Sequence, residues 1–380
     1  MIENKRNYGI DLLRITAMFF IVVLHMLRKG GLTEAAESEN QIFAVWILQA
    51  IVTCAVNCYG LISGYVNVDN KKARYYKLGE LWCKVAFYNL ILTIIFYFIL
   101  TPKGDDSFKP VYWNCCIFPV YTTRYWYFTA YFPLFFFMPY LNKMLNAMTK
   151  TERNVLGIII IVVFTLMPVL MPVLTYDTVE LPNVFRLQSG YSFAWLMLLY
   201  ILGGIMKKND WPGKLSKLKW SIIFAVGVTL TWGLKFIFEA TGFNIKSDTF
   251  YNYTSITMIA CGISLFCVFL KTDIKNNFAI KAIKIASPVS FGVYLIHTNP
   301  FIFNHVLDGA TVKFAENRTI VMTLQIIGLS VGVYLACSVI DFLVSKLFKL
   351  LHIAPTLKKL EDKIYAKIHK HDSEELAATV

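Results

Sequence analysis

The sequence predicts an all-α, polytopic integral membrane protein with about ten transmembrane helices. Of its 380 residues, 57% are hydrophobic and only 16% are charged. A soluble domain of this length has about half apolar and about a quarter charged residues. The apolar residues also occur in long runs, not in short alternating segments. The excess apolar surface therefore has to face lipid.

The individual spans follow from the length of these runs. A transmembrane helix needs about 20 mainly apolar residues, and each adds about 1.5 Å of length. The runs that meet this requirement are 8–29, 42–66, 81–101, 125–145, 154–175, 190–206, 220–239, 252–270, 286–305 and 319–350. The last run is too long for one straight span, so we expect its end to bend or to lie in the membrane interface.

The basic residues between the spans predict the orientation. They number 25 in one set of loops and ends and nine in the alternate set, and cytoplasmic loops carry the excess of Lys and Arg. Both termini are therefore predicted to be cytoplasmic, with an even number of spans. The net charge of +13 is spread over these short clusters. This pattern predicts an anionic bilayer surface as the partner and no nucleic acid.

The chain is predicted to contain one membrane domain and a short extension. Residues 1–350 form the membrane domain, and residues 351–380 form a cytoplasmic amphipathic helix with a disordered tail. The apolar residues that recur at helical spacing among lysines in the extension are Leu357, Leu360, Ile364 and Ile368. Such a pattern is typical of a helix on an anionic membrane surface. A merely solvated tail is the alternative.

The first predicted span contains two ionisable residues, Arg14 and His25, that need an explanation. An ionisable residue at the bilayer centre costs roughly 3 kcal/mol and usually faces the protein interior. A separation of eleven residues turns a helix through about 1100°, so both side chains lie on one face, about 16 Å apart along the axis. Asp11, one turn before Arg14, can pair with it.

These two residues suggest a chemistry with a direction. A guanidinium near the cytoplasmic end suits the phosphates of a large anionic ligand. An imidazole further along the same face can take a proton from a hydroxyl or thiol and return it near neutral pH. The structural alternative is that Arg14 extends to the interface and that His25 is a buried histidine with satisfied hydrogen bonds.

The stretch IDLLRITAMFFIVVLH resembles the opening motif of the acyltransferase 3 family of membrane proteins. That motif has an arginine, ten intervening residues and a histidine in the first helix. Three further stretches resemble the family in the same order: NCYGLISGYVN with Ser63, Gly64 and Tyr65; RYWYFTAYFPLFFFMPYL with Trp126, Tyr127 and Phe128; and SPVSFGVYLIHTNPF with Ser290, Gly292, Tyr294, Leu295 and His297. The resemblance covers about residues 7–350.

The resemblance implies transfer of an acyl group, usually acetyl from cytoplasmic acetyl-CoA, to a hydroxyl of a cell-surface or lipid-linked glycan. The catalytic base would be His25, and Arg14 would bind the donor. Acyl-CoA would be a co-substrate, with no permanently bound cofactor, and succinyl-CoA or another acyl-CoA stays open as the donor. The expected location is the plasma membrane of a bacterium. Family members often continue into an extracytoplasmic esterase-like domain. The given sequence ends soon after the predicted spans, so this chain is expected to be a stand-alone transferase.

Other donor-side and catalytic candidates each have a functional and a structural interpretation. His297 is predicted at about the height of His25, as a second acid or base, an acceptor contact or a helix-packing residue. Arg74, which follows the second span beside several lysines, either binds CoA phosphates or reflects the topology alone. Ser63, with Gly64, marks either a donor contact or a close approach of two helices.

The acceptor-side candidates are Arg124, Trp126 and Tyr294. Arg124, at the outer mouth of the fourth span, either binds a hydroxyl or anionic group of the acceptor or anchors the membrane interface. The acceptor itself leaves no signature in the sequence.

Other functions are less well supported. The sequence has no HExxH, Walker-type or GxSxG motif, and six histidines at scattered depths predict no metal site. A transporter or flippase of a lipid-linked glycan would have broken spans in matching halves. Pro168 and Pro172 interrupt the fifth span, but no counterpart is evident in another half. A membrane sensor or scaffold would leave Arg14 and His25 unexplained. Direct transfer, an acyl-histidine intermediate and the oligomeric state all stay open.

Overall fold

The structure is a computed structural model that describes residues 6–70, 72, 74–103, 111–120, 122–174, 183–241 and 249–378. Within these ranges the chain forms helices and no strand, which confirms the predicted all-α class. Some residues used in the predictions of topology, spans and tail lie outside the described residues: Lys5, Lys71, Lys109, Thr175, Lys246, Thr379 and Val380.

The longer helices are α1 (Tyr8–Arg28), α3 (Glu39–Val52), α4 (Ala55–Asn67), α5 (Tyr75–Leu100), α7 (Trp126–Ala147), α8 (Lys150–Ile161), α9 (Met167–Leu174), α11 (Phe193–Lys208), α12 (Lys217–Thr241), α13 (Ile256–Leu270), α14 (Asn277–His297), α16 (Thr319–Leu350) and α17 (Ile353–Ala378). The shorter helices are α2 (Leu32–Ala35), α6 (Val111–Ile117), α10 (Asn183–Arg186) and α15 (Pro300–His305). A π-helical segment, η3 (Val162–Leu166), joins α8 to α9. Short 3₁₀ turns are η1 (Thr101–Lys103), η2 (Thr123–Tyr125), η4 (Leu187–Gly190), η5 (Pro212–Lys214), η6 (Thr249–Tyr251) and η7 (Val312–Glu316).

Eight helical stretches in the described part of the chain are long and apolar enough to cross a membrane. They coincide with eight of the ten predicted spans, with α3 and α4 counted as one stretch. The other two predicted spans, 125–145 and 190–206, are helices too. However, α11 has only 16 residues, and α7 is rich in tyrosine and contains Pro133 and Pro139. The number of spans therefore stays a prediction.

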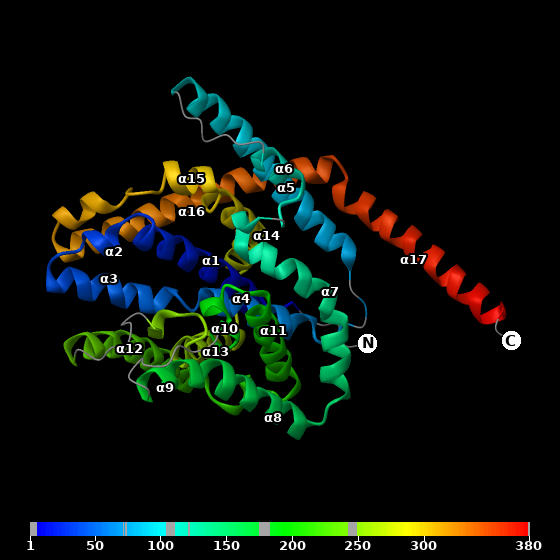
Figure 1. The fold of residues 1–380 in the computed structure, drawn as a ribbon, viewed down its shortest axis with the longest axis horizontal. Coiled ribbons are helices and arrows are strands. Elements are labelled where there is room, and N and C mark those ends of the chain that lie inside the picture. Colours follow the sequence, from blue (N-terminus) through cyan, green and yellow to red (C-terminus); the bar gives the residue numbers. More distant parts are fainter. Residues whose placement is uncertain are drawn as a thin grey trace.

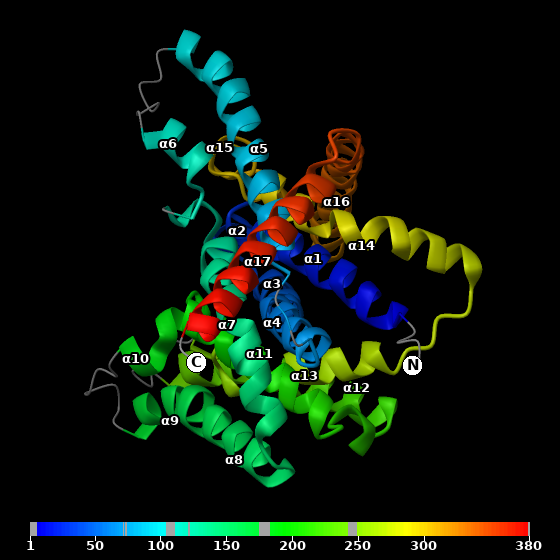
Figure 2. The same cartoon turned by 90° about the vertical axis from the view of Figure 1, so that its right-hand side faces the viewer.

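Helix α1 lies inside the bundle, where it contacts α3, α4, α13, α14 and α16. Figure 1 shows α3 and α16 running roughly along the long axis, with α1 sloping between them. In Figure 2 α1 extends across the view toward the N-terminus. The start of α1 is fixed by Asn7, whose side chain accepts a hydrogen bond from the backbone N–H of Ile10 at 3.2 Å. This is a standard N-cap. Because α1 is surrounded by other helices, most of its polar side chains lie against protein, and Arg28 at its end is exposed.

Helices α4 and α11 approach each other through glycines. A Cβ on Gly64 would lie 1.8 Å from the carbonyl oxygen of Tyr200, and one on Gly203 would lie 2.2 Å from that of Leu61. Small residues allow this close contact between helix backbones in membrane proteins. Helix packing is therefore sufficient to explain Gly64.

Helix α17 packs against the beginning of α5. The chain turns between α16 and α17 at His352, which has a left-handed φ of 52°. The backbone N–H of Tyr76 donates to Glu361 Oε1 at 3.4 Å, and Leu357 lies 3.3 Å from the position of a Cβ on Gly79. Figure 2 shows α17 crossing in front of α5. The extension is thus attached to the membrane domain through α5.

The helix α17 is longer than the sequence predicts. It continues to Ala378 through most of the predicted disordered tail; Glu, Leu and Ala, which form this end, all favour helix. Leu360 and Ile364 on α17 are exposed. The location of this helix on a membrane surface stays a prediction.

Candidate active site

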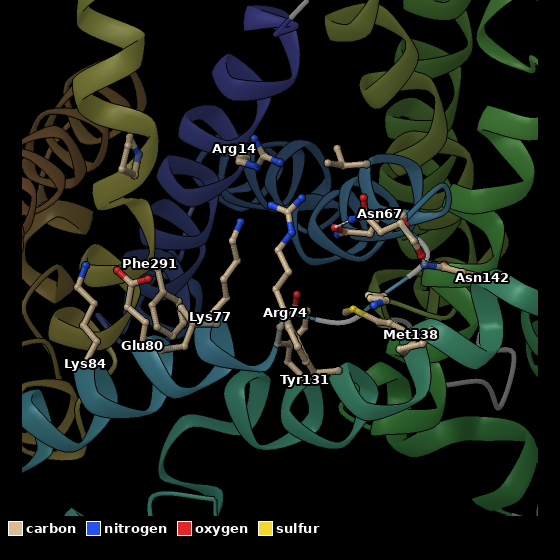
Figure 3. A pocket seen from close by; sticks show the side chains of 17 residues that line it. Arg14, Asn67, Arg74, Lys77, Glu80, Lys84, Tyr131, Met138, Asn142 and Phe291 are labelled. Carbon is tan, nitrogen blue, oxygen red and sulfur yellow. Dashed lines mark hydrogen bonds between the residues drawn. The ribbon is translucent and has the colours of Figure 1, made fainter. Parts of the chain in front are cut away.

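A cavity of 460 Å³, here named the basic cavity, lies beside the first turns of α1 and α5. Its lining residues come from α1, α4, α5, α7 and α14 and the loop before α5. The charged ones are Arg14, Lys72, Arg74, Lys77, Glu80 and Lys84. Figure 3 shows Arg74 and Lys77 extending toward Arg14. Five cations and one carboxylate make this cavity suitable for an anionic ligand.

Arg14 is held in place by the predicted pair with Asp11. Its Nη1 donates to Asp11 Oδ1 at 2.5 Å, and Arg6 Nε donates to the other carboxylate oxygen at 2.5 Å. Asp11 is buried, and Ser287 of α14 donates to it at 3.4 Å. The Arg14 side chain stays 30% exposed, and a guanidinium has five N–H donors. Arg14 is therefore oriented and still has donors for a ligand.

A narrower cavity of 160 Å³, the middle cavity, follows α1 from Arg14 to His25. Met18 and Ile21 line it between these two residues. The other lining side chains are mainly aromatic or hydroxylic: Val56, Tyr59, Trp126, Tyr127, Tyr253, Ser287, Pro288, Ser290, Phe291 and Tyr294. Because Arg14 and His25 line one cavity, the prediction that they share a helix face is confirmed.

A third cavity of 410 Å³, the distal cavity, begins at His25. Its other lining residues are Thr122, Arg124, Trp126, Tyr294, Thr298, Pro300, Phe303 and Asn304. The ring of Trp126 lies beside those of Tyr191 and Tyr253, with centroids 4.7 and 6.1 Å away. The Arg124 guanidinium lies 5.4 Å from the centroid of Phe301. This cavity thus combines aromatic faces, small polar groups and one cation.

The three cavities share lining residues and follow one another along α1; we call this row of cavities the path. The residues common to the basic and middle cavities are Arg14, Pro288 and Phe291. The residues common to the middle and distal cavities are His25, Trp126 and Tyr294. The path leads from the basic cluster along α1 to His25 and then into the distal cavity. His25 itself lines the middle and the distal cavity.

His25 forms a hydrogen bond with His297 of α14. Its Nδ1 lies 3.0 Å from His297 Nε2, and His297 Nδ1 lies 2.6 Å from the carbonyl oxygen of Val293. That oxygen can only accept, so His297 Nδ1 carries a proton. In a neutral His297, Nε2 is then the acceptor, and His25 Nδ1 is the donor. Of the four ring nitrogens, His25 Nε2 is therefore the one whose lone pair remains available to a ligand.

Most of the predicted site residues meet along this path. His25, Arg14, Arg74, Arg124, Trp126 and Tyr294 line it, and His297 contacts His25. Ser63 does not line the basic cavity. Its Oγ lies 3.4 Å from the hydroxyl of Tyr131, which does. The roles of all these residues stay predictions.

Two charged residues near the site were not selected from the sequence. Lys84 lines the basic cavity, and its Nζ donates to Asp341 Oδ2 of α16 at 2.7 Å. Both residues lie within predicted spans, 81–101 and 319–350. The rule that singled out Arg14, an ionisable residue in a span, would have found them.

Comparison with known proteins adds one finding. The model of the acyltransferase 3 family, described as an acyltransferase domain, matches residues 7–342. This range includes all three cavities and both histidines. No curated protein and no solved structure matches the chain.

Proposed function

Because the chain belongs to the acyltransferase 3 family, we propose that it is an integral membrane O-acyltransferase of the bacterial plasma membrane. It transfers an acyl group, acetyl in the first instance, from cytoplasmic acyl-CoA to a hydroxyl of a cell-surface or lipid-linked glycan. One observation carries this proposal. The path through the three cavities meets the His25–His297 pair between a basic end and an aromatic end.

The donor occupies the basic and middle cavities. CoA has phosphates at one end and a thioester at the end of a long, thin arm. Arg14, Arg74 and Lys77 supply charge-assisted hydrogen bonds to the phosphates. The middle cavity, which is narrow and leads to His25, receives the arm. Ser63 acts indirectly, through its contact with Tyr131.

His25 acts as the general base. Its Nε2 takes the proton of the acceptor hydroxyl while the hydroxyl oxygen attacks the thioester carbonyl carbon. The new C–O bond forms, the C–S bond breaks, and the CoA thiolate then takes this proton from Nε2. His297 accepts a hydrogen bond from Nδ1 of His25 and so fixes the reactive tautomer. His297 is therefore a positioning residue in this mechanism.

The same His25 Nε2 could instead attack the thioester and form an acyl-histidine. The two routes differ in their kinetics. Direct transfer requires both substrates to be bound together and gives intersecting lines in double-reciprocal plots. An acyl-histidine gives parallel lines and, without acceptor, a burst of free CoA equal to the enzyme concentration. Access to His25 from two cavities supports direct transfer.

The acceptor occupies the distal cavity. Trp126 and Tyr294 offer aromatic faces to a sugar ring, and Arg124 binds a hydroxyl or an anionic group of the glycan. Small polar groups beside aromatic faces are the usual means of orienting a ligand in such a cavity.

The deciding experiment uses purified protein in lipid nanodiscs, radiolabelled acetyl-CoA and a panel of glycans. We expect His25→Ala to lower transfer by about 10³-fold, within the usual range for a general base. The matched control is His352→Ala, which removes an exposed histidine that lines none of the three cavities. Full activity in His25→Ala would contradict the mechanism.

The donor side is tested in the same assay. We expect Arg14→Ala to raise the KM for acetyl-CoA by about tenfold or more, because a charged hydrogen bond is worth about 1.5–3 kcal/mol. Arg318→Ala, at an exposed arginine before α16, serves as the control. A changed acceptor KM with an unchanged donor KM would place the donor elsewhere.

A further inference from the structure

The carboxylate of Asp341 is completely buried in α16 and binds groups from α5. Lys84 Nζ donates to its Oδ2 at 2.7 Å, and the Tyr88 hydroxyl donates to its Oδ1 at 2.8 Å. Ser345, one turn further along α16, donates to Oδ2 at 3.4 Å. A buried carboxylate with this many donors has a fixed position, because each donor would lose its partner if the carboxylate moved.

The same carboxylate also touches the backbone of α14. A Cβ on Gly292 would lie 1.8 Å from Asp341 Oδ1 and 1.9 Å from its Cγ. No side chain fits at this distance, so the absence of a side chain at Gly292 allows α14 to rest on Asp341. Asp341 is therefore the point at which α5, α14 and α16 meet.

Helix α14 contributes to every part of the candidate active site. Pro288 and Phe291 line the basic and middle cavities, and Tyr294 lines the middle and distal cavities. His297, five residues after Gly292, forms the 3.0 Å hydrogen bond to His25 of α1. The distance between α14 and α1 at this level determines whether that hydrogen bond exists. Displacement of α14 at Gly292 would be transmitted along a rigid helix to His297.

We propose that Asp341 is a positioning residue for the histidine pair: it sets the depth of α14 through Gly292 and thereby holds His297 against His25. This inference rests on the proposed acyl transfer for its catalytic part. Asp341 has no direct contact with a substrate in this scheme. The partner Lys84 links it to the wall of the basic cavity, so the donor site and the histidine pair share one support.

The test is a comparison of Gly292→Ala in two backgrounds. In the natural sequence, the added methyl group collides with Asp341 and pushes α14 away. We expect kcat at saturating substrates to fall by about tenfold or more, since misplacement of catalytic groups by about 1 Å can cost about 10²-fold. The KM for acyl-CoA should change less than kcat, because the charged groups assigned to the phosphates, Arg14, Arg74 and Lys77, do not lie on α14.

The second background is Lys84→Met/Asp341→Ala, which removes the carboxylate and the cation together and leaves no unpaired buried charge. Here the methyl group of Gly292→Ala has space, and we expect kcat to fall less than about threefold further. The rates are expressed per folded molecule. A purely structural role would lower the folded fraction but would leave this rate unchanged.

A matched control is Lys235→Met/Glu239→Gln, which breaks another partly buried ion pair, on α12. It should leave kcat unchanged even where it lowers the unfolding temperature.

Equal losses of kcat in both backgrounds, or no loss from Gly292→Ala in the natural sequence, would overturn the proposal. Absence of acyl transfer by the unmodified protein would instead overturn the proposed function. The unfolding temperatures of the natural protein, Gly292→Ala, the Lys84→Met/Asp341→Ala variant and their combination then still show whether positions 292 and 341 are coupled. Additive changes in unfolding temperature would overturn the contact.

Discussion

The basic cavity and the distal cavity lie at opposite ends of one path and differ in chemistry. The basic cavity has five cationic side chains and one carboxylate among its lining residues. The distal cavity has one arginine, with aromatic rings, two threonines and an asparagine. The distal cavity is lined by His25 itself, and the basic cavity adjoins the middle cavity, which His25 also lines. Under the proposed function, this difference corresponds to two dissimilar ligands that meet at one histidine.

This separation has a clear consequence for mutations. Changes in the basic cavity should affect only the donor, changes in the distal cavity only the acceptor, and changes at the histidine pair only the rate of transfer. The four predictions below test this division, beginning with the largest expected effect.

The histidine pair should control kcat without either KM. We expect His297→Ala to lower kcat by about 10–100-fold, the usual loss when the partner that orients a functional histidine is removed. His297→Gln should recover part of the loss, because its amide oxygen can accept the proton of His25 Nδ1. Initial-rate kinetics with both substrates would show this. If His297→Ala raised one KM and left kcat unchanged, His297 would belong to a substrate site.

The basic cavity should control the donor alone. We expect Arg74→Ala/Lys77→Ala to raise the KM for acetyl-CoA by about tenfold or more, and high salt to narrow the difference from the natural protein. The control is Lys207→Ala, because Lys207 is basic and close to this region but binds Asp69 at 2.8 Å and does not line the cavity. An equal rise of the acceptor KM would break the division between the two ends.

The distal cavity should control the acceptor alone. We expect Arg124→Gln to raise the acceptor KM by about fivefold to tenfold, as for the loss of one hydrogen bond of about 1–1.5 kcal/mol. If the positive charge contributes to binding, the acceptor KM of Arg124→Lys should lie between those of the natural protein and Arg124→Gln. Titration of the glycan at fixed acetyl-CoA measures the effect. A rise in the donor KM instead would mean that both substrates enter from one end.

A small effect is expected beside the basic cavity, at Asp69. Partial burial raises the pKa of this carboxyl, but hydrogen bonds from Lys207 and Lys208 outweigh it and hold the pKa below its ordinary value. A lowered pKa in the folded state adds stability above the ordinary carboxyl range, and this stability is lost as the pH falls through the lowered value. Asp69→Asn should therefore cost under about 1 kcal/mol at neutral pH, and less in acid.

Thermal unfolding at neutral and acidic pH measures this effect. The donor KM should not change in Asp69→Asn if Lys207 and Lys208 lie outside the donor site. A lower donor KM in this variant would show that the two lysines, once released from Asp69, contribute to donor binding. Lys207 and Lys208 would then belong to the donor site.

The sequence alone predicts those parts of the site that depend on one helix. Periodicity places Arg14, His25 and Asp11 on one face of α1, and the Arg14–Asp11 pair is confirmed at 2.5 Å. Hydropathy likewise locates eight of the ten predicted spans. These properties follow from local geometry, 100° and about 1.5 Å per residue, and need no knowledge of neighbours.

Contacts between distant helices could not be predicted in this way. His25 and His297 are 272 residues apart in sequence, and periodicity gives their heights but not their distance. The same holds for Lys84 and Asp341, 257 residues apart. Gly292 has a specific partner only because α14 and α16 touch at this position. Helix packing, and not hydropathy, creates the cavities and decides which polar residues meet in them.

The hydrogen bond from His297 to the carbonyl of Val293 has a consequence for the proton that His25 takes up. A carbonyl oxygen cannot pass a proton onward, so a proton taken up by His25 has no exit through His297. The two histidines thus form a closed end and not a proton wire. In our scheme the proton of the acceptor hydroxyl passes to the departing thiolate while the acyl group passes to the acceptor. Each turnover therefore exchanges two groups between the substrates without a net transfer of charge.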